Sequence, residues 1–271
     1  MDVLNLRETV LALAGVDAVV YLIHGLGDAD FRHTDREAAE NLRDAVDHQG
    51  VRRLVYFSGL IPDVSAADLS EHLASRLEVE ETLAQSTAST LTLRAAMVVG
   101  SGSTSFEMVR QISERLPLLQ TIPTWMRDTV VQPIAVADAV HYLAEAVERV
   151  HVTGHLDVAG RDRLTYPELL DLYADIAGLT RIQVTVPGLP EELVGWVAGQ
   201  LTDVDTPTVQ SLMASLRHDM VADLEPIAAL GPHDPMPLRQ SIRRALAADD
   251  GDLDGADVAG DPARASAADR V

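Results

Sequence analysis

Histidine, arginine, serine and glycine residues stand at positions of this sequence where they could do chemistry. His24 and Gly25 follow one apolar run, Ser58 follows a second, and Gly100 opens a glycine–serine stretch after a third. Parallel sheets bind ligands at the carboxyl ends of their strands, where glycine permits close approach and serine both donates and accepts hydrogen bonds. We therefore expect a ligand cleft at this edge. The alternative is that these residues only form the tight turns that α/β proteins need.

A second candidate is the pair His72 and Arg76. The two residues are four apart in a segment expected to be helical, so they share one helix face. Such a pair can present an acid/base group and a fixed positive charge to one ligand. The alternative is a solvated helix face in which Arg76 pairs with Glu80. The residues alone favour this alternative.

Several kinds of site are excluded by what the sequence lacks. All 21 basic residues are arginine, which rules out a Schiff-base lysine, a Walker A lysine and the catalytic lysine of ordinary short-chain dehydrogenases. The absence of cysteine rules out disulfides, zinc–thiolate sites and thiol nucleophiles. The glycine–serine stretch at 100–105 matches neither a Walker A loop nor a GxSxG turn, and no HExxH motif occurs. We expect no metal site.

Charge and hydropathy restrict the partners and the compartment. The chain has 42 acidic residues among its 271, and its formal net charge of −21 repels nucleic-acid phosphates. The aspartate excess without lysine predicts a protein adapted to a salt-rich cytosol, although GC-rich coding also favours arginine over lysine. The apolar stretches are interrupted or too short to cross a bilayer, and the amino terminus does not resemble a signal peptide. We expect a cytoplasmic protein without a membrane span.

Helical and strand patterns alternate along the chain. Residues 5–14, 31–48, 63–85, 106–115 and 136–149 read as helices, and residues 17–23, 51–57, 90–99 and 155–158 read as strands. Capping boxes are expected at Thr104–Glu107 and Thr165–Glu168. The alternation predicts an α/β fold, a Rossmann-like parallel sheet covered on both faces, over residues 1–159. Residues 160–247 predict a small, mostly helical second lobe, and residues 248–271 a disordered acidic tail.

The order of the segments resembles a known family. The stretches GVDAVVYLIHGLG, REAAENLRDAVDHQGVRRLVYFSGL, LSEHLASRLEVEETL, LRAAMVVGSGSTSFEMVRQISERLP and QPIAVADAV follow one another as in atypical short-chain dehydrogenase/reductases. Within that branch the sequence is most similar to the NmrA-like NAD(P)H-binding proteins. The resemblance covers residues 2–247 approximately. It implies that residues 1–159 form a partial NAD(P)-binding domain and that residues 160–247 form a substrate lobe.

The resemblance also implies roles for individual residues. The Asn-Ser-Tyr-Lys tetrad of the family falls on Asn41, Ser58, His72 and Arg76, so HxxxR replaces YxxxK. His72 could still move a proton near neutral pH, and Arg76, with Ser58, could still hold the ribose hydroxyls. The cofactor-binding positions of the family fall on Asp2 and Val3 near the adenine, His24 and Gly25 beneath the ribose, and Arg94, Ala95 and Gly100 beside the nicotinamide.

The start of the sequence departs from the family pattern. Relatives have a strand, a GxxGxxG turn, a helix and two further strands before the position of Met1, about 60 residues at ~30 per βα unit. The printed sequence lacks that glycine fingerprint, which would hold the pyrophosphate at a helix N-terminus. We expect a sheet that is incomplete on its N-terminal side, because of a truncation or a misplaced start, or as a natural half-fold. We also expect weak dinucleotide binding and a possible oligomer contact through the exposed sheet edge.

These observations predict an NAD(P)-binding, oxidoreductase-like protein with NAD or NADP as its cofactor. Its substrate would be a small or lipidic carbonyl compound or a quinone. One alternative is a redox sensor that binds NAD(P) without catalysis, because HxxxR stands in place of YxxxK. Another is a fragment that binds no cofactor.

Overall fold

A four-stranded parallel sheet forms the centre of the first compact part of the molecule. The computed structural model describes residues 1–25, 30–116 and 118–249. The strands are β1 (Ala18–Tyr21), β2 (Arg53–Gly59), β3 (Ser89–Ala95) and β8 (Gly154–Val158), in the spatial order β1-β2-β3-β8. Each neighbouring pair is parallel, and Tyr21, Tyr56 and Thr92 stand side by side in the register.

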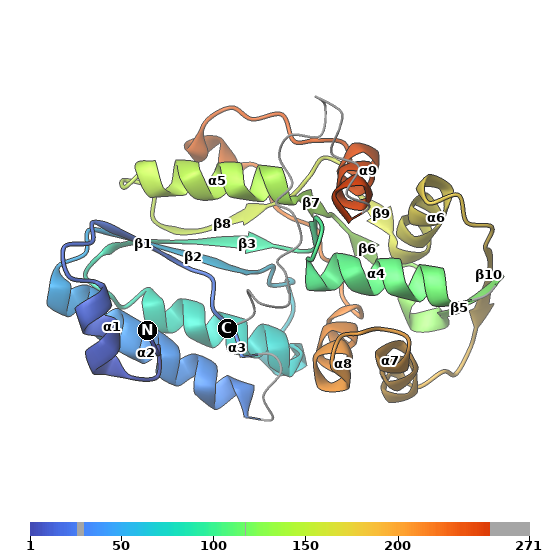
Figure 1. Cartoon of the computed structure of the whole chain (residues 1–271), viewed down its shortest axis with the longest axis horizontal. Coiled ribbons are helices and arrows are strands. Elements are labelled where there is room, and N and C mark those ends of the chain that lie inside the picture. Colours follow the sequence, from blue (N-terminus) through green and yellow to red (C-terminus); the bar gives the residue numbers. More distant parts are fainter. Residues whose placement is uncertain (26–29, 117, 250–271) are drawn as a thin grey trace. The chain divides into compact units, whose positions relative to one another are not determined.

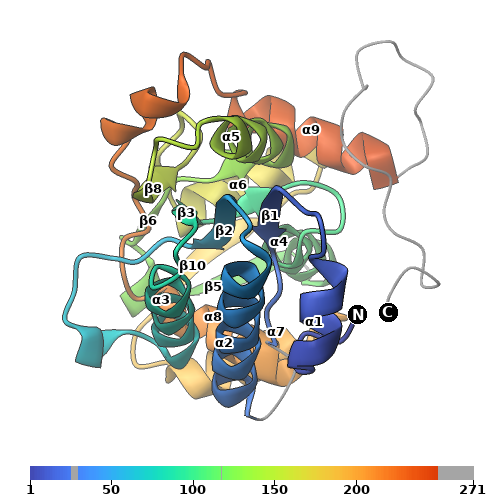
Figure 2. The ribbon, with the colours of Figure 1, turned by 90° about the vertical axis from the view of Figure 1, so that its left-hand side faces the viewer.

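Helices cover both faces of this sheet. They are α1 (Leu6–Ala12), α2 (Phe31–Gln49), α3 (Glu71–Leu83) and α5 (Val136–Glu148), with short 3-10 turns η1 (Ala66–Asp68) and η3 (Pro226–Leu230). Figures 1 and 2 show α5 on one face of the sheet, with α2 and α3 side by side on the other. Apolar side chains from β1, β2, α2 and α3 pack into one core that includes Leu42, Leu54 and Leu83. Burial on both faces explains why the strands read as continuous apolar runs.

One buried arginine joins the sheet to its covering elements. The Arg53 side chain is 1% exposed. Its Nε donates to the Ala146 carbonyl at 2.8 Å, and its Nη1 donates to the carbonyls of Val152 at 2.8 Å and Ser89 at 3.2 Å. Carbonyl oxygens thus take the place of a carboxylate partner, and the guanidinium fixes the end of α5 to β2 and β3.

The chain divides into two compact units, and each draws on separate stretches of sequence. Unit 1 contains residues 1–95, 140–158 and 222–233, which include the parallel sheet. Unit 2 contains residues 96–139, 159–221 and 234–271. These units interleave along the sequence, whereas the predicted domains are continuous. The predicted limits at 159/160 and 247/248 therefore stay a prediction.

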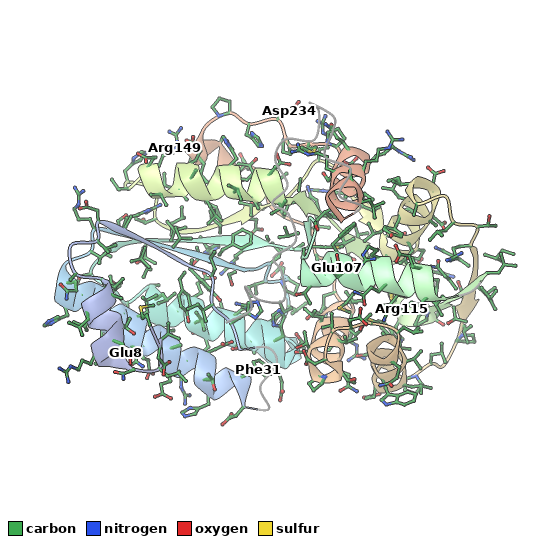
Figure 3. The ribbon with its side chains drawn as sticks, in the orientation of Figure 1. Glu8, Phe31, Glu107, Arg115, Arg149 and Asp234 are labelled. Atoms are coloured by element: carbon green, nitrogen blue, oxygen red, sulfur yellow. The ribbon has the colours of Figure 1, made fainter. Side chains whose placement is uncertain are left out.

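Unit 2 is rich in helices with three short two-stranded ladders. Its helices are α4 (Thr104–Arg115), α6 (Tyr166–Ile176), α7 (Glu191–Gln200), α8 (Thr206–Ser215), α9 (Leu238–Asp249) and the turn η2 (Thr124–Met126). Its ladders pair β4 (Val98–Val99) with β7 (Ile134–Ala135), β5 (Leu119–Pro123) with β10 (Ile182–Val186), and β6 (Val130–Val131) with β9 (Leu164–Thr165). Figure 3 shows Glu107 on α4 and Arg115 at the end of that helix. Arg110 lies between these two positions and bonds Glu107 at 2.6 Å.

The structure confirms the predicted fold class, an α/β protein with a parallel Rossmann-like sheet and a helix-rich second region. Gly50 ends α2 with a positive φ of 66°, as expected of a glycine stop. The α6 capping box at Thr165–Glu168 is also present.

Three local predictions were wrong. The strand expected over residues 90–99 is two strands, because the chain bends at Ala96 and β4 pairs with β7 instead of continuing the large sheet. The helix expected from residue 63 starts at Glu71, where the Ser70 side chain caps it by accepting from the Leu73 amide. The capping box expected at Thr104 is not formed, because Ser103 occupies the cap position of α4 and makes no side-chain cap bond.

The two remaining predictions concern a membrane span and the C-terminal tail. No helix within residues 1–25, 30–116 and 118–249 is long and apolar enough to cross a membrane. The expected disordered tail lies almost wholly outside the described residues, since α9 runs to Asp249.

Candidate functional site

The candidate site of unit 1 is built on the inner face of α3. His72, Ser75, Arg76 and Glu80 are all buried, at spacings of three and four residues that place them along one stripe of the helix. Such a stripe is normally apolar in a helix that covers a sheet. The inner face of α3 therefore carries these polar groups beside the apolar Leu73 and Val79, near the carboxyl ends of the strands.

Arg76 is 7% exposed, and its Nη1 donates to the Tyr56 hydroxyl at 3.3 Å. Glu80 does not pair with it. Both carboxylate oxygens of Glu80 instead accept from Arg94 of β3, at 2.7 and 2.9 Å. The alternative of a solvated helix face with an Arg76–Glu80 pair is therefore wrong.

His72 is 8% exposed, one helical turn before Arg76. Burial lowers the pKa of His72 to about 3, and the positive charges of Arg76 and then His24 add to this effect. The imidazole is consequently neutral at physiological pH. A proton-donating role at neutral pH would need a change in its surroundings that raises this pKa.

Asp35 of α2 connects the loop after β1 to α3. This carboxylate is 5% exposed, accepts from the Gly25 amide at 2.7 Å and accepts from the Ser75 hydroxyl at 3.1 Å. A Cβ at position 25 would stand 3.3 Å from the nearer Asp35 oxygen, so glycine permits this close approach. The loop that carries His24 is thus held at a fixed place beside the carboxyl end of the sheet.

His24 lies at the exposed rim of this arrangement. Its pKa is lowered, mainly because the surrounding protein desolvates part of the imidazole and secondly because of Arg76, while Asp35 acts in the opposite direction. The charges of Arg76 and Asp35 also act on Tyr21 of β1, although burial is the main cause that raises the pKa of Tyr21. The positive charge of Arg76 therefore acts on His24, Tyr21 and His72 alike.

Ser58 stands near the end of β2 and is 5% exposed. It is the register partner of Arg94, whose side chain reaches Glu80 of α3, so Ser58 lies on the same face of the sheet. Its hydroxyl is buried and has no hydrogen-bond partner among the described residues. An unsatisfied buried hydroxyl is costly to a protein, so each one calls for an explanation such as a catalytic role or a bound water or ion.

The other predicted site residues of unit 1 are placed less centrally. The Asn41 amide donates to the Val3 carbonyl at 3.1 Å, which brings these two residues together before α1. Asp2 is exposed, and its carboxylate accepts from the Leu4 amide at 2.9 Å. In the described part of the chain, no hydrogen bond or ion pair joins Asn41, Asp2 or Val3 to His72 or Arg76.

The remaining predicted positions lie at strand ends. Ala95 ends β3, and its carbonyl accepts from the Leu60 amide at 2.8 Å. Gly100 belongs to unit 2, where a Cβ would come within 2.7 Å of the Val136 side chain, so its small size serves packing there. Gly27, a further glycine after the first apolar run of the sequence, lies outside the described residues.

Sequence reasoning missed several residues of this site. Asp35 sits in a charged helix whose other acidic groups are mostly exposed, and the sequence contains no signal that distinguishes it. Ser75 could have been found, because it precedes Arg76 on the same helix face as His72. No group of three or more histidine, aspartate or glutamate side chains suited to a metal occurs within the described residues.

Comparison with known proteins places this arrangement in a widespread fold. No protein-family model matches the chain, and no curated protein matches it in sequence. The structure is similar to WbmH from Bordetella bronchiseptica, solved in complex with NAD+, with a TM-score of 0.67 and 18% identity over 91% of this chain and 80% of that one.

Two further solved structures show the same likeness. RMD from Pseudomonas aeruginosa, complexed with NADPH, has a TM-score of 0.65 and 17% identity over 91% of this chain and 84% of that one. A nucleoside-diphosphate-sugar epimerase from Staphylococcus aureus has a TM-score of 0.70 and 14% identity over 90% and 82% of the two chains. At these identities the likeness establishes the fold alone, and the NmrA-like subgroup stays a prediction. The chain has the Rossmann-like fold that these three structures share.

Proposed function

We propose that this protein binds NAD or NADP and acts as an oxidoreductase of the atypical short-chain dehydrogenase type. The substrate would be a small or lipidic carbonyl compound or a quinone. One observation carries the proposal, namely the buried polar face of α3, with His72 and Arg76, at the carboxyl edge of a parallel sheet. The same fold holds NAD+ in WbmH and NADPH in RMD. Ligands of such sheets bind at this edge.

The described residues fit the ribose and nicotinamide end of such a cofactor. Arg76 uses only Nη1 in a hydrogen bond within the described chain, so its other donors are available for ribose hydroxyls. The Ser58 hydroxyl is buried without a partner, as expected of a group that a ligand completes. The Gly25 amide is held by Asp35, which also bonds Ser75, the neighbour of Arg76 in the sequence. The proposal is confined to this end of the dinucleotide.

Arg76 and His72 would have different roles in the reaction. A reduced nicotinamide, when bound, would supply a hydride for a carbonyl carbon, whose oxygen would then need a proton. Arg76 would donate to a ribose hydroxyl and hold the cofactor in place. His72 would deliver the proton through its ring nitrogen, which requires that the imidazole become protonated in the complex.

A second candidate function is a redox sensor that binds NAD(P) without turnover. The observation that favours it is the neutral state of His72, because burial and Arg76 lower the pKa of this residue to about 3. A histidine without a proton at neutral pH is a poor acid. The two functions share the cofactor site and differ only in whether a substrate activates His72.

Binding of the cofactor can be measured by saturation-transfer NMR with NADH and with NADPH, a method that detects weak complexes. We expect Arg76→Ala to weaken binding at least tenfold, since charge-assisted hydrogen bonds contribute about 1.5–3 kcal/mol. Arg32→Gln, which removes an exposed arginine paired with Glu78, is the matched control and should bind as the wild type does. Equal binding by Arg76→Ala and Arg32→Gln would contradict the assignment of this site.

Ser58→Ala separates ligand binding from stability. Because the hydroxyl has no partner in the described chain, its removal should leave the free energy of unfolding unchanged or raise it by about 1 kcal/mol. If the hydroxyl serves the ribose, the same change should weaken NADH or NADPH binding. A loss of stability without a loss of binding would show that Ser58 is structural.

A further inference from the structure

Arg76 is unusual among the arginines of this acidic protein. The sequence offers two carboxylates for each arginine, 42 against 21. Most described arginines make an ion pair with aspartate or glutamate; these are Arg32, Arg36, Arg43, Arg52, Arg94, Arg110, Arg115, Arg127, Arg149, Arg161, Arg217 and Arg239. Arg76 has no such pair within residues 1–25, 30–116 and 118–249, although it is only 7% exposed.

Burial of an unpaired cation is expensive, so the comparison with Arg53 is informative. Arg53 also lacks a carboxylate, but three backbone carbonyls accept its protons and account for its position. Among the described residues, the Arg76 guanidinium donates to one acceptor, the Tyr56 hydroxyl. Arg76 therefore has donors left for a ligand.

Asp35 and Glu80, the two carboxylates of this site, make no ion pair with Arg76. Asp35 is the nearby carboxylate, and it already accepts from the Gly25 amide and the Ser75 hydroxyl. Glu80 is fully engaged by Arg94. His24 and His72 offer neutral imidazoles, which can donate a hydrogen bond to an anion but cannot neutralise a cation.

We propose that the guanidinium of Arg76 binds the carboxylate of the substrate, with His72 and His24 at its sides, so that the protein acts on a small carbonyl compound that carries a carboxylate. This assignment of a substrate class rests on the proposed oxidoreductase function. A guanidinium fork matches the two oxygens of a carboxylate. One guanidinium also matches the charge of a monoanion, whereas a phosphate dianion would call for a second cation. The guanidinium has five donors, so a bond to a ribose hydroxyl and a bond to this carboxylate are compatible.

Binding of such an anion would have a consequence for His72. The carboxylate would cancel the repulsion between Arg76 and a protonated imidazole, and would itself attract the proton. The charged groups that lower the pKa of His72 are Arg76 on its own helix and His24, while Tyr21, Asp35 and Tyr56 lie nearby on β1, α2 and β2. Asp35 carries a negative charge that raises the pKa of His24, but burial, Arg76 and His24 still keep the pKa of His72 low. The substrate would therefore bring the charge that lets His72 act as an acid.

The test is a pH titration of the His72 ring by NMR, without any dinucleotide, in the intact protein. Spectra of ¹⁵N-labelled histidine are recorded from pH 7 down to pH 4.5 with pyruvate, with inorganic phosphate, or with chloride at matched ionic strength. His72→Gln identifies the resonance. With chloride, we expect a neutral ring over the whole range. With pyruvate, the titration midpoint should rise by about 1 to 3 pH units, so that a protonated fraction is seen at pH 5.

Two variants sharpen the result. Arg76→Gln should abolish the response of His72 to pyruvate, and Arg76→Lys, which keeps the charge but not the fork, should weaken pyruvate binding several-fold. Arg32→Gln is the control and should respond as the wild type does. If Arg76→Gln fails to fold, the comparison of pyruvate with chloride in the wild type still tests the proposal.

Three outcomes would overturn the inference. They are an unchanged His72 ring with tens of millimolar pyruvate, an equal response in Arg76→Gln, and a response to phosphate without one to pyruvate. This last outcome would assign the charge to a phosphate of the cofactor. Because no dinucleotide is present, a pyruvate response in a protein that binds neither NADH nor NADPH would support the carboxylate site while refuting the proposed cofactor function.

Discussion

The buried imidazole of His72 couples the stability of unit 1 to pH. Its pKa is about 3 in the folded protein and near the ordinary 6.5 in the unfolded chain. Between these two values the unfolded state binds a proton that the folded state does not, so stability is lost as the pH falls from about 6.5 towards 3. Above pH 6.5 both states are neutral, and His72 has no effect.

We therefore expect His72→Gln to be less sensitive to acid than the wild type. Over the interval from pH 7 to pH 5, the wild type should lose about 2 kcal/mol more of its free energy of unfolding than the variant, because His72 contributes up to ~1.4 kcal/mol per pH unit there. Urea unfolding at pH 7, 6 and 5 measures the difference. Parallel pH profiles for the two proteins would show that His72 is not buried in a neutral form.

Individual residues of the site were only partly predictable. The spacing of His72 and Arg76 predicted a shared helix face, but the sequence did not show that this face points into the protein. The sequence does not distinguish a buried aspartate such as Asp35 from an exposed one, because its partners Gly25 and Ser75 are 10 and 40 residues away. Chemistry that depends on contacts between distant segments is therefore absent from local patterns.

At the scale of single elements, the two threonines that suggested capping boxes give a matched pair. The Thr165 hydroxyl accepts from the Glu168 amide at 3.4 Å, and the Glu168 carboxylate accepts from the Thr165 amide at 2.7 Å. Thr104 is the first residue of α4 and makes no cap bond. Thr165→Ala should lower the free energy of unfolding by about 1 kcal/mol, whereas Thr104→Ala should change it little.

Chemical denaturation of the two variants provides the measurement. The comparison is direct because both threonines begin a helix of unit 2 and both are followed three residues later by glutamate. A similar loss for the two substitutions would mean that the difference between the caps is not real. The pair also shows why a motif of four residues is insufficient, since a neighbouring Ser103 can take the cap position.

The larger elements were predictable for a different reason. Strands β2 and β3 read as apolar runs because both of their faces are covered, and long helices such as α2 keep a strong apolar stripe. Two of the short ladders of unit 2 consist of two-residue strands, which have no periodicity to detect, and the ladder of the five-residue strands β5 and β10 was not foreseen either. The division of residues 90–99 between β3 and β4 was hidden for the same reason, since the apolar run continues through the bend.

For the molecule as a whole, the net charge of −21 predicts a dependence on salt. Repulsion between carboxylates destabilises the folded state, and added ions screen it within about 10 Å at 0.1 M and about 3 Å at 1 M. We expect the melting temperature to rise by several degrees between 0.1 and 1 M KCl. Adaptation to a salt-rich cytosol, which stays a prediction, would make it rise further between 1 and 3 M.

Thermal unfolding followed by circular dichroism tests both statements. Sucrose at matched osmolality serves as a control for general solvent effects. A melting temperature that is flat or falls from 0.1 to 1 M KCl would refute the role of charge repulsion. A plateau above 1 M would favour GC-rich coding as the origin of the arginine-only composition.

The interleaving of the two units has a consequence for how the protein is made. Strand β3 is complete at residue 95, but its neighbour β8 begins at residue 154, after a long stretch that belongs to unit 2. Residues 222–233 return to unit 1 later still. During translation the nascent sheet must therefore wait, with one side of β3 unpaired, while segments of the other unit emerge from the ribosome. Chaperones that shield open strand edges would act in this interval, and neither unit can be obtained by simple truncation of the chain.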